Sequence, residues 1–127
     1  VVTRNVALTP VDDAPVLAGI ESGTLTYAEN DPPLAITAAL TVSDVDSFHL
    51  TGATVQITAN YHNGQDVLAF ANAGGITGIW TAGTGTLALS GLDTLANYQA
   101  ALRAVTYQNT SENPGSATRT VSFTPRS

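Results

Sequence analysis

The sequence predicts an all-β protein, a Greek-key antiparallel β-sandwich of about 7–9 strands with one short helix near residues 94–103. The first observation behind this prediction is an apolar period of two, as in Ala53–Ala59, where odd-numbered residues are apolar and even-numbered residues are polar. The second is that the strand-like runs are short, rich in Thr and Val, and separated by Gly, Asn, Asp and Pro. A chain of 127 residues, 43% of them hydrophobic, can bury one core, which indicates a single domain.

The strands are expected within nine short segments of the chain. In the last of them, Arg119, Val121 and Phe123 share one face, and the neighbouring Thr and Ser residues share the other. Asn63-Gly64 predicts a hairpin turn, because both residues tolerate positive φ, and we expect Asp66 to close that turn rather than join a second metal site. The segments are Pro15–Ile20, Thr24–Ala28, Leu40–Ser43, Ala53–Ala59, Val67–Asn72, Ile79–Ala82, Thr86–Ser90, Ala104–Gln108 and Thr118–Thr124.

One segment has the helical period instead. Leu95, Tyr98 and Leu102 fall at i, i+3 and i+7 with alanines between them, which predicts a short amphipathic helix. Asp93 or Thr94 is expected to cap its N-terminus. We expect this helix to plug one end of the sandwich where the chain crosses between sheets.

The chain contains a near-copy of its own last strand. TRNVALTP (residues 3–10) matches TRTVSFTP (residues 118–125) at five of eight positions, with an offset of 115 residues, the size of one small domain. This self-similarity indicates a tandem array. It predicts that residues 1–10 are the last strand and linker of a preceding repeat, that 11–125 form the repeat unit, and that 126–127 are a tail.

The copied strand raises the question of where it pairs. If repeats run end to end, residues 3–10 leave the unit at the end opposite the slot that Thr118–Pro125 fills, and the five-residue linker VDDAP is too short to return them. We therefore expect these residues not to fill that slot in their own unit. Removal of the C-terminal strand is expected either to unfold the domain or to drive a strand-swapped dimer through residues 3–10.

Charge and composition exclude several classes of function. Four arginines, no lysine and ten acidic residues give a net charge of −6, which argues against a nucleic-acid partner and against insertion into an acidic membrane. The chain has no cysteine, so disulfides cannot stabilise it. His49 and His62 are expected to be exposed loop residues, and no nucleophile or metal-binding spacing accompanies them, so the protein is not expected to be an enzyme.

Seven of the ten acidic residues lie in the first 46 residues, and most fall in three short groups, VDDAP (11–15), AEND (28–31) and SDVDS (43–47). If the three groups meet at one end of the sandwich, carboxylates about 5 Å apart repel by roughly 3 kcal/mol per pair at an effective dielectric near 20. A bound cation would relieve this repulsion, and carboxylate oxygens favour calcium. The alternative is that these acids cap backbone amides in solvated turns.

Together these motifs resemble the cadherin-like repeats of large bacterial surface adhesins, relatives of cadherin and of chondroitin sulfate proteoglycan-type repeats. The resemblance implies a calcium site near the junction of two repeats with Asp13, Glu29, Asp44 and Asp46 as ligands, and Asp12 and Asp31 as weaker candidates. SDVDS lacks the Gly-Asp that often follows in such motifs, which implies weak binding or a site completed by the neighbouring repeat.

The resemblance also implies a setting and a function. The protein is expected to be extracellular, at the bacterial cell surface, as one link in a stalk that calcium stiffens. Its partners are then the neighbouring repeats of the same chain, with a cell-surface glycan or protein as a further candidate. A different class of function, a carbohydrate- or peptide-binding module, would use the aromatic surfaces of Trp80, Tyr61 and His62, although the indole can equally pack over the sheet.

Overall fold

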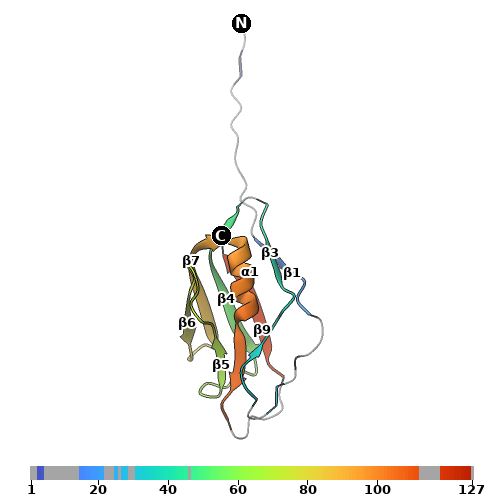
Figure 1. Ribbon diagram of the computed structural model, residues 1–127, viewed down its shortest axis with the longest axis vertical. Helices are drawn as coiled ribbons and strands as arrows, with labels where there is room; N and C mark the ends of the chain where they lie inside the picture. The colour runs from blue at the N-terminus through green and yellow to red at the C-terminus, as the bar shows by residue number, and fades with distance from the viewer. Residues whose placement is uncertain are drawn as a thin grey trace.

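The computed structural model describes residues 3–4, 15–21, 25, 27–28, 31–45, 47–111 and 118–126. Within these residues, nine strands form three antiparallel sheets and one helix connects two of the sheets (Figure 1). The all-β sandwich with one helix that the sequence predicts is therefore confirmed.

The largest sheet has four strands in the order β6-β7-β4-β9, the second has three in the order β2-β8-β5, and the third pairs β1 with β3. Eight of the nine predicted strand segments contain a strand; the described residues of the ninth, Thr24–Ala28, are not in one, and β2 was not predicted. The strands are β1 (Val16–Ala18), β2 (Leu34–Ala35), β3 (Thr41–Ser43), β4 (His49–Ala59), β5 (Asp66–Ala69), β6 (Thr77–Thr81), β7 (Thr86–Thr94), β8 (Thr106–Asn109) and β9 (Thr120–Arg126), and the helix is α1 (Leu95–Ala104).

The core lies between the sheets and follows the predicted alternation. On β4, which is hydrogen-bonded on both sides, Val55 and Ile57 point inward and are almost fully buried. Burying side chains of this size is worth about 1.5–3 kcal/mol each, so the central strand contributes strongly to stability. The other buried apolar residues come from every layer: Leu40, Val42, Leu50, Ala53, Leu68, Ile76, Leu87, Leu89, Tyr98, Ala101, Leu102 and Val105.

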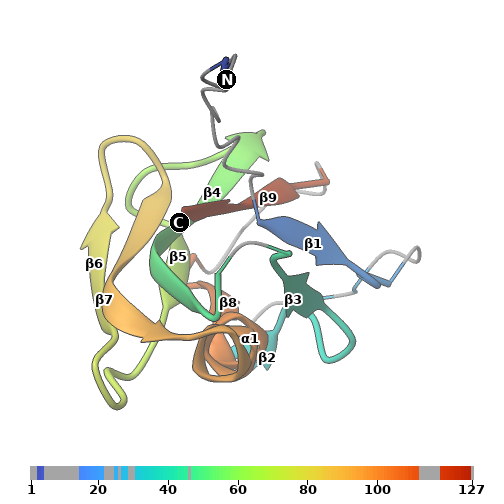
Figure 2. The same ribbon diagram turned by 90° about the horizontal axis from the view of Figure 1, so that it is seen from above.

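Helix α1 begins directly after β7, at the predicted cap. The Thr94 hydroxyl accepts a hydrogen bond from Asn97 N at 3.1 Å, and the Asp93 carboxylate accepts from Thr94 N at 2.8 Å. Tyr98, on the buried side of the helix, packs into the core. The helix carries the chain from the four-stranded to the three-stranded sheet, as expected, but it lies lengthwise and in line with β8 rather than across an end of the sandwich (Figures 1 and 2).

The two ends of the sandwich can be defined from the strand register. At one end, which we call the linker pole, Val16 is paired with Ser43, His49 with Thr94, and Gly52 with Arg126. At the other end, the far pole, Ala59 is paired with Thr120, and Asp66 with Asn109.

Strand β1 begins and strand β9 ends at the same pole, the linker pole (Figure 1). The expectation that the two connections to neighbouring repeats lie at opposite ends is therefore wrong. The shared pole follows from the path of the chain. Strand β3 runs to the linker pole, and β4 returns to the far pole. Because β9 is antiparallel to β4, the last residue of β9 lies at the linker pole.

Candidate functional site

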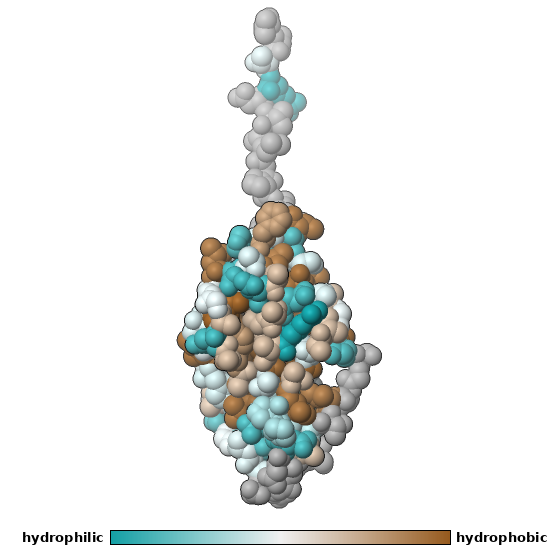
Figure 3. Space-filling model, in the orientation of Figure 1, coloured by the Kyte–Doolittle hydropathy of each residue, from teal (hydrophilic) through white to brown (hydrophobic). Residues whose placement is uncertain are grey.

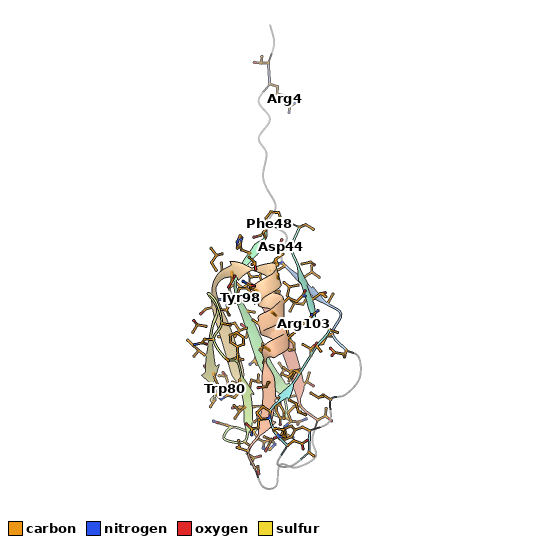
Figure 4. All side chains as sticks on the ribbon, viewed as in Figure 1. Arg4, Asp44, Phe48, Trp80, Tyr98 and Arg103 are labelled. Atoms are coloured by element: carbon orange, nitrogen blue, oxygen red, sulfur yellow. The ribbon has the colours of Figure 1, made fainter. Side chains whose placement is uncertain are left out.

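Asp44 is the one predicted metal ligand of the first rank that the structure describes. It directly follows β3 at the linker pole, its side chain is half-buried, and its Oδ2 atom is buried within the protein (Figure 4). Asp12, Asp13, Glu29 and Asp46 lie outside the described residues. Among the residues that the structure describes, no three His, Cys, Asp or Glu side chains are grouped closely enough to hold a metal ion.

Ala28 and Asp31, the described residues of the AEND group, lie at the other end of the molecule. The Asp31 carboxylate accepts a hydrogen bond from Ala28 N at 2.8 Å, so it closes its own turn. The Tyr27 hydroxyl donates to the backbone oxygens of Asp31 and of Asn109, which belongs to the far pole. The structure therefore does not bring Asp31 and Asp44 together, so the condition that all three acidic groups meet at one end is not met for Asp31.

The first and third acidic groups flank a paired stretch of backbone. Val16, the first residue of β1, lies directly opposite Ser43, the last residue of β3. In sequence, VDDAP ends immediately before Val16, and Asp44 follows Ser43. The strand pairing thus brings the chain that follows the linker to the side of Asp44.

The linker pole also carries two exposed apolar side chains. Val45 and Phe48 are each 84% exposed, and they occupy the connection between β3 and β4 that contains Asp44. Brown, hydrophobic surface lies at this end of the sandwich in Figure 3, and Figure 4 shows Phe48 beside Asp44. An acidic group bordered by exposed apolar side chains is a surface suited to contact with another protein unit.

A buried carboxylate at the far pole was not found from the sequence. The Asp66 side chain is fully buried; its Oδ1 accepts from Tyr107 Oη at 2.6 Å and from Asn109 Nδ2 at 2.8 Å. Its Oδ2 accepts from His62 N at 2.8 Å and from Arg119 Nε at 3.1 Å. Asp66 closes the turn as predicted, because its amide also donates to His62 O at 3.0 Å, but the network extends far beyond the turn. The turn is not the predicted hairpin, because it joins β4 and β5, which lie in different sheets.

The Asp66 network keeps the carboxylate charged. Burial raises the pKa of Asp66, but the hydrogen bonds from Tyr107, His62 N, Arg119 and Asn109 outweigh it, so the pKa lies below its usual value. Burial, followed by the hydrogen bond to Asp66, raises the pKa of Tyr107 to about 12. Four donors surround the carboxylate, so this site is a structural ion pair rather than a place for a metal. The sequence signal for it was Arg119, a charged residue on the apolar face of its strand.

The aromatic residues of the alternative binding site pack on the sandwich. Tyr61 and Trp80 meet edge to face, with ring centroids 6.1 Å apart and planes at 78°, and both contact the core. The Tyr61 hydroxyl donates to the backbone oxygen of Ala82, and its ring lies over Gly85, where a Cβ atom would come within 2.9 Å. His62 is exposed, as expected. The Trp80 indole therefore packs over the sheet, as the alternative interpretation of this residue had it.

The carboxylate of Glu21, another of the early acidic residues, is also hydrogen-bonded to neighbouring groups. Its carboxylate accepts from Thr37 Oγ1 at 2.5 Å and from Ala38 N at 3.0 Å. The hydrogen bond from the Thr37 hydroxyl, followed by that from Ala38 N, lowers the pKa of Glu21 to about 2. Glu21 and Asp31 thus follow the alternative interpretation, in which acids satisfy backbone amides in turns.

These features define a small antiparallel β-sandwich domain with one acidic, partly apolar pole and a structural ion pair at the other. In comparisons with known proteins, no family model, no curated protein and no solved structure matches this chain. In the described part of the chain, no helix is long and apolar enough to cross a membrane.

Proposed function

We propose that this domain is a calcium-binding structural repeat of an extracellular bacterial adhesin, one link in a tandem stalk at the cell surface. The observation that carries the proposal is the antiparallel register of β1 and β3, in which Val16 is opposite Ser43. Pro15 directly precedes Val16 and Asp44 directly follows Ser43, while Asp13 and Asp46 each lie three residues along the sequence from that pair. The linker acids and the SDVDS acids would then share the linker pole.

The chemistry of this donor set fits calcium. Asp12, Asp13, Asp44 and Asp46 supply only carboxylate oxygens, which are hard ligands, and the chain has no cysteine to attract softer metals. These ligands come from the linker and from the connection between β3 and β4, so an ion bound to them would cross-link the linker to the sandwich. Asp31 is less suited to the same ion, since its carboxylate accepts a hydrogen bond from Ala28 N and its backbone oxygen accepts one from Tyr27, which also contacts Asn109 of the far pole. Glu29 lies outside the described residues and stays a proposed ligand.

The exposed side chains of the same pole support a role in an array. Val45 and Phe48 would be covered where the neighbouring repeat, connected through residues 11–15, packs against this end. Extracellular calcium modules bind with dissociation constants of about 10⁻⁴ to 10⁻³ M, so the ion would be bound outside the cell and absent inside it. The stalk would be stiff only after export.

Calcium titration tests the proposal on this chain and on a protein containing two consecutive repeats. With free calcium at about 100 times the dissociation constant, we expect the free energy of unfolding to rise by roughly 2.7 kcal/mol. Asp44→Asn with Asp46→Asn should remove most of this rise, whereas the control Asp31→Asn should keep it. Identical melting curves in EDTA and in excess calcium for both proteins would rule the proposal out.

A further inference from the structure

We propose that residues 3–10 are a second β9, able to take the place of β9 in the same sandwich by forming a hairpin with β1. The site is the β9 slot, which we define as the edge of β4 from Gly52 to Ala59 together with the buried carboxylate of Asp66. The occupant is a strand with the pattern Thr-Arg-x-Val-x-apolar-Thr-Pro, which occurs at residues 3–10 and again at 118–125.

The present occupant of the slot is held by a few specific contacts. Arg119, just before β9, pairs with Asp66 at 3.1 Å, and Val121 and Phe123 pack against the core. The backbone of β9 pairs with β4 along its length, and Pro125, which has no N–H to donate, lies opposite Ala53 on this edge strand. A competing strand must therefore supply an arginine at the position of Arg119 and apolar residues at the positions of Val121 and Phe123. A proline is acceptable at the position of Pro125.

Residues 3–10 bring all of these at the matching positions. With the offset of 115, Arg4 corresponds to Arg119, Val6 to Val121, Leu8 to Phe123 and Pro10 to Pro125. The other two differences are conservative for this slot: an asparagine replaces Thr120, which is exposed, and an alanine replaces Ser122, which is half-buried on the outer face. The copy thus retains the side chains through which β9 contacts the rest of the domain.

The topology lets the copy reach the slot in its own chain. A strand in the β9 slot ends at the linker pole, where β1 begins, and the two strands are adjacent and antiparallel (Figure 2). They line one shallow apolar hollow of about 220 Å³ between Leu17 and Ala18 on one side and Val121 and Phe123 on the other. Five residues, 11–15, then connect Pro10 to Val16, and hairpin loops of 2–5 residues are common.

This geometry reverses the expectation drawn from the sequence alone. Exchange with a second molecule is not required, because residues 11–15 have only to connect the end of the β9 slot to the start of β1 at the same pole. One slot therefore has two candidate strands in one chain, one on each side of the domain, and residues 11–15 are the hinge between the two arrangements. In a tandem array each repeat would take either its own last strand or the strand that precedes it.

Disulfide trapping in the full chain tests the proposal, since the protein has no cysteine of its own. Thr54 on β4 is directly opposite Thr124 on β9, and Thr9 corresponds to Thr124. Thr9→Cys with Thr54→Cys should form a disulfide within one chain under mild oxidation, because each visit of residues 3–10 to the slot is captured. Thr124→Cys with Thr54→Cys reports the resident strand, and Ala7→Cys with Thr54→Cys is the control out of register.

The arginines provide the second arm. Adding Arg119→Gln should raise the yield of the disulfide between positions 9 and 54 at least tenfold, because only Arg4 can then neutralise Asp66, and adding Arg4→Gln as well should abolish the gain. If Arg119→Gln prevents folding, the yield of the disulfide between positions 9 and 54 with both arginines native still tests the proposal. A yield of this disulfide no higher than that of the out-of-register control would overturn the proposal. Exclusively interchain disulfides, read on a non-reducing gel, would overturn it in favour of a strand-swapped dimer.

Discussion

Nε of Arg119 lies 3.1 Å from Oδ2 of Asp66, and this ion pair joins the two main sheets of the sandwich. Asp66 begins β5 in the three-stranded sheet, and Arg119 immediately precedes β9 in the four-stranded sheet. The Asp66 side chain is fully buried and that of Arg119 is only 11% exposed, so both partners are largely shielded from water. The start of the last strand is thus tied to the other sheet through one carboxylate, in addition to its backbone pairing with β4.

Arg119→Gln is expected to lower the free energy of unfolding by about 3–5 kcal/mol, because it leaves a buried carboxylate without its cation. The matched control is Arg126→Gln, which removes an exposed arginine from the end of the same strand and should change stability by less than about 0.5 kcal/mol. Both are to be measured by urea denaturation in an Arg4→Gln background, so that the copied strand cannot supply a replacement. Equal effects of the two substitutions would contradict this role of Arg119.

Stability is expected to fall in acid below about pH 4, as carboxylates with lowered pKa values take up protons. Asp66, Asp93 and Glu21 all have folded-state pKa values below their ordinary ones, that of Glu21 at about 2. Such groups stabilise the fold above their unfolded pKa, and the contribution is lost as the pH falls through the folded pKa. Urea denaturation between pH 5 and pH 2 measures the slope. Asp66→Asn should make this slope shallower. An unchanged slope would show that folding does not lower the pKa of Asp66.

Gly91→Ala is expected to be severely destabilising, by more than about 3 kcal/mol, for two reasons. Gly91 has φ +118°, a conformation that L side chains rarely adopt, and a Cβ atom there would come within 1.8 Å of Gly75 O. Gly83→Ala is the control, since a Cβ at Gly83 meets nothing within 4 Å. Thermal melting of both variants checks this. A mild effect at Gly91 would mean that β7 and the turn at residues 74–75 separate easily.

Trp80→Ala is expected to lower the free energy of unfolding by about 2 kcal/mol, because the indole packs against the core and against Tyr61. Phe48→Ala, at a side chain that is 84% exposed, should change it by less than about 0.5 kcal/mol in the isolated domain. Chemical denaturation compares the two. A Trp80→Ala variant as stable as the native protein would return the indole to the list of candidate binding surfaces.

Much of the fold could be predicted from the sequence, because its strands alternate cleanly and its turns carry Gly, Asn and Pro. Helix α1 was predicted to within one residue of its bounds, since Leu95, Tyr98 and Leu102 mark one face and Thr94 caps it. Strand β2 was missed because Leu34–Ala35 is too short to show a period. Its strand partner β8 provides the pairing, which is a tertiary effect invisible in the local pattern.

The arrangement of the acidic residues could not be predicted, because spacing along the chain does not say at which pole a turn falls. Asp31 and Asp44 are separated by a crossing of the sandwich, through β2 and β3, and so belong to opposite ends. The Asp66 network was missed for a similar reason. Tyr107, Asn109 and Arg119 come together around it from β8 and from the start of β9, and only the position of Arg119 on an apolar face gave a hint.

The shared pole of β1 and β9 has a mechanical consequence for a domain that would sit in a stalk. Tension applied through the two ends of the domain would load Val16 and Arg126 at the same end of the sandwich. Strand β9 would then be peeled from β4 one hydrogen bond at a time, as in unzipping, instead of all bonds being sheared together. A cross-link that joins residues 11–15 to the connection between β3 and β4 would take up that force before it reached the edge strand.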